Sequence, residues 1–291
     1  MRAHPIWPNL LVHDDDELGD QLGCPVTSRV RVHEWPLTVT DRVILDDGRA
    51  FAYKAQLPPS IEVEFYAAAR SSLLPPQIEF PRIEGSAGHW IATEWISSPS
   101  LRELIDDPAF GTLTAAASIA ERACAEISLL DPRLPVLRDI GGVDAWRTLA
   151  ARTLDGLTRE VDAERYPGVD GADVRRLRDW SESLPVLAAV DTEAVIQHGD
   201  LTGHEVFPTA EGLRVIDWQR PVRGPRGIDL ANLLHDIGID PRSHVDEALV
   251  QISRFLLIDW AVDASTEILP GADPAIPGSW VRQALVDFFT S

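Results

Sequence analysis

Two aspartates lie close together in the sequence between residues 195 and 218, in a pattern that suits chemistry. An apolar, strand-like run ends in His198-Gly-Asp200, and a second run over residues 213–216 ends in Asp217. A turn signal at Glu211-Gly212 predicts that the second run is part of a hairpin. Two carboxylates delivered in this way fit phosphoryl transfer. One aspartate orients or deprotonates the attacking hydroxyl, and the other holds Mg²⁺ against the phosphates.

The third candidate is a lysine. Lys54 is the only lysine among 26 basic residues, and all the others are arginine. An arginine cannot imitate a compact ammonium group in a tight phosphate site, so this lone lysine is a candidate for phosphate binding. The alternative is a surface lysine that remains by chance.

The elements that carry Lys54 are predicted to form a small sheet. Residues 29–33, 42–45 and 50–55 have strand-like patterns, and Asp46-Asp-Gly-Arg49 predicts a hairpin between the last two. Ser60 is expected to cap a helix over residues 61–73, after Pro58-Pro59 ends the third strand. Two more strands are expected over residues 78–83 and 89–95.

The remainder of the chain is predicted to be mainly helical. The expected helices cover residues 113–130, 143–165, 172–189, 229–237, 245–263 and 280–289. The turn-like segment Ser97-Ser-Pro-Ser100 separates them from the sheet. We therefore expect an α+β chain of two lobes, residues 1–95 and residues 96–291.

Composition excludes several classes of protein. The chain has 45% hydrophobic and 25% charged residues, which is typical of a globular protein. No apolar run reaches the ~18 residues of a membrane span, and the N-terminal segment lacks the pattern of a signal peptide, so a cytoplasmic location is expected. Cys24 and Cys124 have no ligand-like spacing, which gives no support to a disulfide framework.

The net charge of −20 argues against nucleic acid as a partner, because phosphate contacts need clustered basic residues. The same charge would attract a cationic partner over long range, although a generally acidic surface is the simpler explanation. Asp259 and Asp263 are the carboxylates that we consider for an acceptor site. Their alternative role is an exposed helix face.

Three motifs in order resemble the aminoglycoside phosphotransferase and choline kinase superfamily, which has a protein-kinase-like fold. They are His198-Gly-Asp-Leu201, Val215-Ile-Asp-Trp218 and Gly227-Ile-Asp-Leu-Ala231. The resemblance implies that Asp200 is the catalytic base, that Asp217 binds metal and that His198 braces the loop. It implies that Asp229 ties its helix to that loop.

The N-terminal region adds to the resemblance. Lys54 occupies the position of the kinase lysine that contacts the nucleotide phosphates, and Glu62 or Glu64 the position of its glutamate partner. These two glutamates point about 200° apart on a helix, so one of them faces the lysine, and Glu62 is the first choice. Glu94 and Trp95 fall at the hinge that holds adenine through backbone atoms. ATP and Mg²⁺ are the implied cofactors.

Two departures from the family pattern leave open whether the protein is catalytically active. Glu205 occupies the position of the asparagine that binds the second metal ion, although a glutamate is also a hard oxygen ligand for Mg²⁺. No glycine lies between Gly23 and Gly48, where a loop that covers phosphates normally needs glycine.

We therefore expect an ATP-dependent kinase that phosphorylates a hydroxyl of a small molecule, such as an aminoglycoside-like antibiotic, an amino alcohol or another metabolite. The alternative is a catalytically inactive kinase fold that binds a nucleotide, a ligand or a partner protein. An enzyme of this fold that uses GTP or transfers another group is a third possibility, and the sequence does not single it out.

Overall fold

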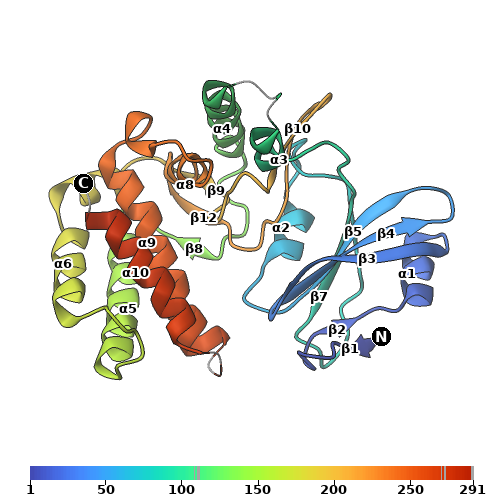
Figure 1. Ribbon diagram of the computed structural model, residues 1–291, viewed down its shortest axis with the longest axis horizontal. Helices are drawn as coiled ribbons and strands as arrows, with labels where there is room; N and C mark the ends of the chain where they lie inside the picture. The colour runs from blue at the N-terminus through green and yellow to red at the C-terminus, as the bar shows by residue number, and fades with distance from the viewer. Residues whose placement is uncertain (108, 110–111, 270, 272, 290–291) are drawn as a thin grey trace. The chain divides into compact units, whose positions relative to one another are not determined.

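The computed structural model describes residues 1–291 except 108, 110–111, 270, 272 and 290–291. The chain forms two compact units. The first unit comprises residues 1–100 and 205–220, and the second comprises residues 101–204 and 221–291. Figure 1 shows strands in the first unit and mostly helices in the second, which confirms the predicted α+β class.

A five-stranded antiparallel sheet forms the centre of the first unit. Its strand order is β3 (Val26–Trp35), β4 (Thr38–Leu45), β5 (Ala50–Gln56), β7 (His89–Glu94) and β6 (Gln77–Glu79). Lys54 pairs with Thr40 on β4 and with Ile91 on β7, so the lysine lies on the central strand. The five predicted strands are confirmed. Strand β6 is shorter than expected, because Pro81 cannot donate a ladder hydrogen bond.

The hairpin between β4 and β5 forms where the Asp-Gly pair predicts it. The backbone N–H of Gly48 donates to the Leu45 carbonyl oxygen at 3.0 Å, and the Leu45 N–H donates to the Arg49 carbonyl oxygen at 2.9 Å. Gly48 has φ 83°, a conformation that glycine adopts without a steric cost. The turn therefore fixes the register of the strand that carries Lys54.

The two faces of this sheet have different neighbours. Successive side chains on a strand alternate, so Tyr53 and Lys54 lie on opposite faces. Figure 1 shows helix α1 (Asp15–Leu22) against the sheet, and its Leu18 and Leu22 belong to the same apolar core as Tyr53. The short strands β1 (Arg2–Ala3) and β2 (Leu11–Val12) pair with each other beside this core. The face of Lys54 is left for helix α2 (Glu62–Ala68).

Helix α2 is shorter than predicted, and its predicted cap is wrong. It begins after Ile61, which makes no capping hydrogen bond through its side chain. The Ser60 hydroxyl donates to the Gln56 side-chain oxygen and accepts from the Glu62 N–H at 3.4 Å, from one residue before the observed cap position. The helix ends at Ala68, because the backbone of Ala69 is extended, and this is well before the Pro75-Pro76 pair that was expected to stop it.

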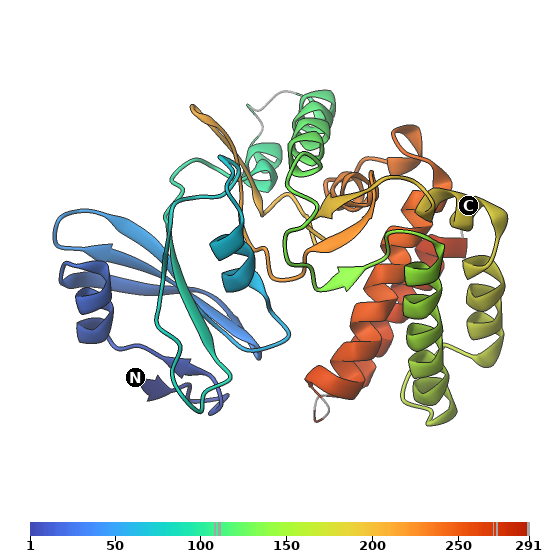
Figure 2. The same ribbon diagram turned by 180° about the vertical axis from the view of Figure 1, so that it is seen from behind.

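The second unit is built mainly from helices, as Figure 2 shows from behind. Their bounds are α3 (Leu101–Asp106), α4 (Leu113–Ile127), α5 (Val143–Asp162), α6 (Gly171–Ser181), α7 (Leu184–Val190), α8 (Ile228–Asp236), the 3₁₀ turn η1 (Pro241–Ser243), α9 (Glu247–Asp263), the π turn η2 (Ala264–Ile268) and α10 (Ala275–Phe289). Aromatic side chains fill the core between α5, α6, α9 and α10. The Trp146 and Phe255 rings lie 5.2 Å apart, and the Trp180 and Phe288 rings 4.5 Å apart.

The predicted helix over residues 172–189 is wrong as a single element, since it is split into α6 and α7. Pro185 lies in the first turn of α7. A proline fits this position because its missing N–H would have no partner there, whereas inside a helix it would break the ladder. The remaining predicted helices are present, with ends that differ by a few residues.

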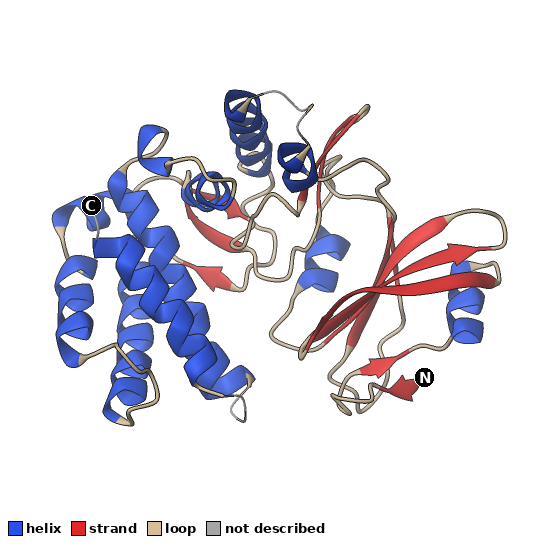
Figure 3. Cartoon of the chain, in the orientation of Figure 1, coloured by secondary structure: helices blue, strands red, loops and turns tan. Residues whose placement is uncertain are grey.

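A three-stranded sheet, red in Figure 3, supports the loop that carries Asp200. Strand β12 (Val222–Pro225) lies between β8 (Arg138–Asp139) and β9 (Ala194–Gln197). Val222 pairs with Gln197, so the first residue of β12 lies beside the last residue of β9, directly before His198. Strands β8 and β12 escaped prediction, because neither has an apolar run of useful length.

A hairpin far along the sequence completes the first unit. Strands β10 (Val206–Thr209) and β11 (Gly212–Val215) pair antiparallel, with Val206 opposite Val215. The Val215 N–H donates to the Leu73 carbonyl oxygen at 2.7 Å, which attaches the hairpin to the segment after α2. This attachment brings Asp217 into the same unit as Lys54. Among the helices of the described residues, none is long and apolar enough to cross a bilayer.

Candidate active site

Lys54 is bonded to two carboxylates within the first unit. Its ammonium nitrogen lies 2.8 Å from a Glu62 carboxylate oxygen and 2.5 Å from Asp217 Oδ1. Burial disfavours the charged ammonium group, but Asp217 and Glu62 outweigh burial and raise the pKa of Lys54 above its ordinary value. The lysine is therefore a fixed positive charge, held between helix α2 and the segment after β11.

Of the two candidate glutamates, Glu62 is the one that contacts Lys54. Its side chain is buried, while Glu64 forms ion pairs with Arg82 and, at 3.4 Å, with His89. Burial raises the pKa of Glu62, and the neighbouring Lys54 opposes that rise. The glutamate thus depends on the lysine for its charge.

Asp217 has an unusual backbone conformation. Its φ is 69°, in the left-handed region that only two non-glycine residues adopt within the described parts of the chain. Aspartate tolerates this region better than most residues, but the conformation persists only where the surroundings hold it. The side chain of Asp217 is 41% exposed, so an oxygen is accessible to a ligand.

The neighbours of Asp217 hold it to helix α2. The Trp218 ring is fully buried and stacks on Phe65 of α2, with ring centroids 4.4 Å apart and planes at 9°. The Ile61 N–H, at the start of α2, donates to the Gln219 carbonyl oxygen at 3.2 Å. The start of helix α2 is therefore held to residues 217–219 by two contacts, one on each side of Glu62. The Trp218 contact was not predicted, although its large apolar side chain beside Asp217 was a usable signal.

Glu205 lies one residue before β10, on the same hairpin. Its carbonyl oxygen accepts from the Ile216 N–H at 3.1 Å, which places Glu205 across the hairpin from the residue before Asp217. Both residues belong to the first unit. Within the described residues, no group of three or more histidine, cysteine, aspartate or glutamate side chains is arranged to hold a metal ion. Two hard carboxylates suit Mg²⁺ all the same, since this ion usually takes one or two carboxylates together with phosphates and water.

The predicted hinge residues use their N–H groups within the first unit. The Glu94 N–H donates to the Pro76 carbonyl oxygen at 2.8 Å, and the Trp95 N–H donates to Ala50 at 2.9 Å. The Arg42 guanidinium lies over the Trp95 ring, 4.8 Å from its centroid. The N–H groups of Glu94 and Trp95 are therefore both used within the sheet.

In the second unit, Asp229 ties helix α8 to the loop that carries Asp200. Its two carboxylate oxygens accept from the N–H groups of His198, at 2.5 Å, and Gly199, at 3.0 Å. Its own N–H donates to the Gln197 side-chain oxygen at 3.1 Å. Burial raises the pKa of Asp229 to about 6, although the two backbone bonds favour the charged form. The predicted contact between this helix and the loop is confirmed.

Two further residues of α8 hold the same loop. Asn232 donates to the Leu201 carbonyl oxygen at 2.9 Å, and Asp236 accepts from the Gly203 N–H at 2.8 Å. Residues 229, 232 and 236 are three and four positions apart, so they share one face of the helix. Sequence reasoning missed Asn232 and Asp236, although their spacing from Asp229 was visible. The loop is therefore braced along its length, with Asp200 half-buried within it.

The carboxylates considered for an acceptor site have another role. Asp259 is 3% exposed and Asp263 is 7% exposed, so an exposed helix face is wrong for both. Arg138 pairs with each of them, Arg152 lies 2.5 Å from Asp259 Oδ1, and the Thr153 hydroxyl also donates to Asp259. Burial raises the pKa of Asp263 to about 6. Two guanidinium groups neutralise this carboxylate pair.

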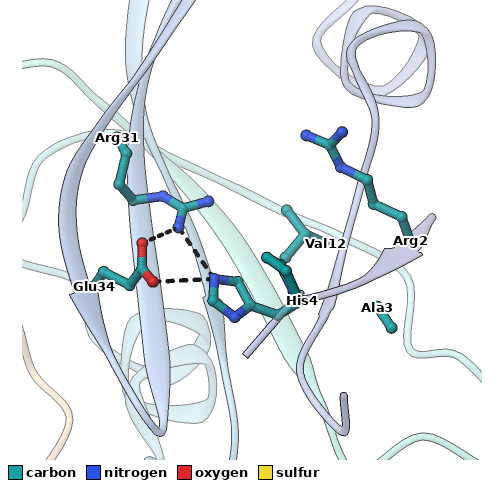
Figure 4. Close-up of a pocket in the computed structure, with 7 residues that line it drawn as sticks. Arg2, Ala3, His4, Val12, Arg31 and Glu34 are labelled. Carbon is teal, nitrogen blue, oxygen red and sulfur yellow. Dashed lines mark hydrogen bonds and ion pairs between the residues drawn. The ribbon is translucent and has the colours of Figure 1, made fainter. Parts of the chain in front are cut away.

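A cavity in the first unit lies behind the sheet. Its volume is about 380 Å³, and Arg2, His4, Val12, Arg31 and Glu34 are among its lining residues (Figure 4). Arg31 pairs with Asp41 on β4, and Asp41 is opposite Tyr53. The cavity therefore lies on the Tyr53 face of the sheet and is separate from the Lys54 site.

Comparisons with known proteins identify the family of the chain. The sequence model of the phosphotransferase enzyme family matches residues 31–264. A search of curated proteins found no match.

Similar solved structures include a thermostable mutant of aminoglycoside phosphotransferase APH(4)-Ia in its apo form, with a TM-score of 0.63 and 14% identity over 96% of this chain and 100% of that chain. A choline/ethanolamine kinase family protein from Mesorhizobium loti has a TM-score of 0.58 and 13% identity, over 90% of this chain and 88% of that one. A macrolide 2′-phosphotransferase type I has a TM-score of 0.53 and 16% identity, over 97% and 99%.

These likenesses confirm the predicted protein-kinase-like fold. The family match covers more than half of the sequence and includes Lys54, Asp200 and Asp217. The chain belongs to the phosphotransferase enzyme family.

Proposed function

We propose that this protein is an ATP-dependent kinase that transfers the γ-phosphoryl group to a hydroxyl of a small molecule. Family membership supports a small-molecule phosphotransferase, and structures of relatives with ADP or AMP-PNP support an adenine nucleotide as donor. One observation carries the proposal. The only lysine of the chain lies on a central strand, buried, between the two carboxylates that kinase chemistry requires beside it.

In the proposed mechanism, residues 1–95 form the nucleotide-binding lobe and residues 96–291 the catalytic and acceptor-binding lobe. Lys54 turns from Asp217 to the nucleotide phosphates while Glu62 retains it. Glu94 and Trp95 contribute backbone carbonyl oxygens toward adenine. Asp217, helped by Glu205, would hold Mg²⁺, which supplies neutralisation of phosphate charge when it is bound.

Asp200 orients the acceptor hydroxyl and accepts its proton as the oxygen forms its bond to the γ-phosphorus and ADP leaves. The braced loop serves this role, because Asp229 and Asn232 of α8 hold residues on both sides of Asp200. His198 is fully buried and would act by holding the loop, without transferring protons. Catalysis would thus depend mainly on positioning.

The acceptor is proposed as a small hydroxylated molecule such as an aminoglycoside-like antibiotic or an amino alcohol. Related proteins were solved with hygromycin B and with streptomycin. The net charge of −20 would attract a cationic acceptor over long range. Asp259 and Asp263 are matched by arginines and do not add to that attraction. We propose that the protein works in the cytoplasm, where ATP is present.

A second candidate function is nucleotide or partner binding without catalysis. Glu205 adds a negative charge beside Asp217, and the hairpin between β3 and β4 has no glycine. Trp35 pairs with Thr38, and the Leu57 N–H bonds to the Leu37 carbonyl oxygen at 2.8 Å. Without glycine, the backbone amides of this hairpin approach phosphates less closely than those of a glycine-rich loop.

The test is turnover of Mg²⁺-ATP with a panel of hydroxylated acceptors. Asp200→Ala should lower turnover by about 10³-fold and leave nucleotide binding intact, whereas exposed Asp131→Ala should have no effect. Equal activity of Asp200→Ala and the wild type contradicts the proposed mechanism. Stabilisation by nucleotide without turnover of any acceptor supports the second candidate, and no stabilisation by any nucleotide with or without Mg²⁺ argues against both nucleotide roles.

A further inference from the structure

Gln56 lies on the same face of the sheet as Lys54. It is two residues further along β5, and side chains two positions apart point the same way. Its cross-strand neighbours are Thr38 on β4 and His89 on β7. The side chain is only 1% exposed. A buried amide in this place must find its hydrogen bonds within the protein or in a ligand.

One end of the Gln56 amide is occupied and the other is not. Its oxygen accepts from the Ser60 hydroxyl, and the Ser60 oxygen lies 3.4 Å from the Glu62 N–H. Its nitrogen is buried without a hydrogen-bond partner among the described residues. An amide donor left without a partner inside a protein costs about 1–3 kcal/mol, so its retention here calls for a reason.

The reason lies in the group beside it, the carboxylate of Glu62. Burial raises the pKa of Glu62, and Lys54 and, to a lesser degree, the Gln56 amide oppose that rise. The other titratable groups that face this carboxylate are Lys54 on β5, Asp217 after β11 and Tyr66 on α2. Of these neighbours, Lys54 is the only cation. Gln56 is therefore a second source of donors for a buried carboxylate that otherwise relies on Lys54 alone.

We propose that Gln56 is a positioning residue that orients Glu62 toward Lys54 by donating its side-chain N–H group to the Glu62 carboxylate. The inference rests on the proposed function, in which Lys54 turns from Asp217 toward the phosphates of a nucleotide. During that turn the Gln56 donor keeps Glu62 charged and in place, while the Ser60 hydroxyl fixes the amide from its other side. The device serves nucleotide binding without touching the nucleotide.

A purely structural role predicts a different ranking of two variants. Gln56→Glu retains an oxygen that accepts from Ser60 but sets a second carboxylate against Glu62. Gln56→Met has a similar volume and loses both polar groups. If Gln56 only braces Ser60, the Glu variant stays close to wild type and the Met variant is worse. If Gln56 positions Glu62, the Glu variant is the worse of the two, because like charges repel at close range.

The first measurement is the dissociation constant of Mg²⁺-ATP by calorimetry. We expect it to rise about 10-fold in Gln56→Met and about 100-fold in Gln56→Glu, since a hydrogen bond to a charged group is at stake in the first and repulsion is added in the second. The turnover number at saturating ATP should change far less than the KM for ATP. Gln77→Glu is the control, because Gln77 donates to the Tyr66 carbonyl oxygen in the same unit and has no contact with Glu62. A Glu variant that binds as tightly as wild type overturns the inference.

The second measurement uses the nucleotide-free protein. It therefore tests the role of Gln56 even in the case that the wild type binds no nucleotide and the proposed function fails. Gln56→Glu should lower the melting temperature more than Gln56→Met does, and Glu62→Gln should remove that difference. If the order of the two variants is the same in the Glu62→Gln background, the glutamine acts on something other than Glu62 and the inference is wrong.

Discussion

The buried charges at Lys54 and Asp229 are held in contrasting ways. Lys54 pairs with two charged side chains from different elements, α2 and the segment after β11. Asp229 accepts from two backbone N–H groups of one loop, with no ion pair to a cation among the described residues. Side-chain carboxylates can be exchanged for a ligand, whereas backbone amides cannot move away. The first arrangement therefore suits a group that changes partners, and the second suits a permanent brace.

The largest effect is expected when the lysine of the first arrangement is removed. Lys54→Met should reduce turnover by about 10³-fold, because a preorganised cation beside the phosphates is lost. The fold should survive, since Glu62 then takes up a proton as its pKa rises further. Turnover and melting temperature should be measured side by side, with Arg82→Met as the control that removes an exposed ion pair to Glu64. Loss of folding together with activity would mean that Lys54 is mainly structural.

The second effect breaks the brace. Asp229→Ala leaves the N–H groups of His198 and Gly199 without their acceptors in a buried site, and should lower the free energy of unfolding by about 2–5 kcal/mol. Chemical denaturation measures this change. Asp131→Ala, which removes an exposed carboxylate, is the matched control. Surface substitutions usually change the free energy of unfolding by less than about 0.5 kcal/mol. A change of that size in Asp229→Ala would show that the loop is held without Asp229.

The third effect sharpens the comparison through pH. The pKa of Asp229 is raised to about 6 in the folded protein, above its ordinary value of 3.8, so between these values the folded state binds a proton that the unfolded state has lost. Stability contributed by this group is therefore highest below pH 4 and falls as pH rises toward 6, by at most about 1.4 kcal/mol per unit.

The measurement is the free energy of unfolding of the wild type minus that of Asp229→Asn, determined from pH 4 to pH 7. The subtraction removes the titration of carboxylates such as Asp263, which both proteins share. A difference that stays constant across this range would mean that Asp229 keeps an ordinary pKa in the folded protein.

The smallest expected effect concerns Asn232. Its side chain donates one hydrogen bond to the Leu201 carbonyl oxygen, and Asn232→Ala should cost about 1 kcal/mol. If the brace also orients Asp200, turnover should fall several-fold while the affinity for ATP is unchanged. An equal loss of turnover and of ATP affinity would instead point to a general loosening of both units.

The sequence predicts best where local chemistry decides the structure. Asp46-Asp-Gly-Arg49 forms the hairpin it predicts, because the turn needs only a glycine at φ 83° and short polar neighbours. Pro185 was a visible stop signal within the predicted helix over residues 172–189, and it was overlooked. Ser60 has the residue type of a helix cap, but the helix begins one residue later than that role requires, and its cap position is Ile61. The residue type of a cap therefore does not fix where the helix begins.

Contacts between distant segments were accessible only through the motifs. Lys54 and Asp217 are 163 positions apart, and no periodicity connects them. Strands β8 and β12 are short and pair across a wide gap in sequence, so no local pattern predicts either strand. The left-handed backbone of Asp217 also follows from its surroundings, since an aspartate after a strand is ordinarily extended.

The attachment of residues 205–220 to the first unit has a consequence for synthesis of the protein. When the first 100 residues have emerged from the ribosome, Phe65 still lacks the ring of Trp218, and Lys54 has one carboxylate where it will have two. The five-stranded sheet lies within residues 26–94, but more than 100 further residues must be synthesised before the hairpin of β10 and β11 joins the same unit. Interactions that form so late are slow to form, and an incomplete unit in the meantime is a natural client for chaperones.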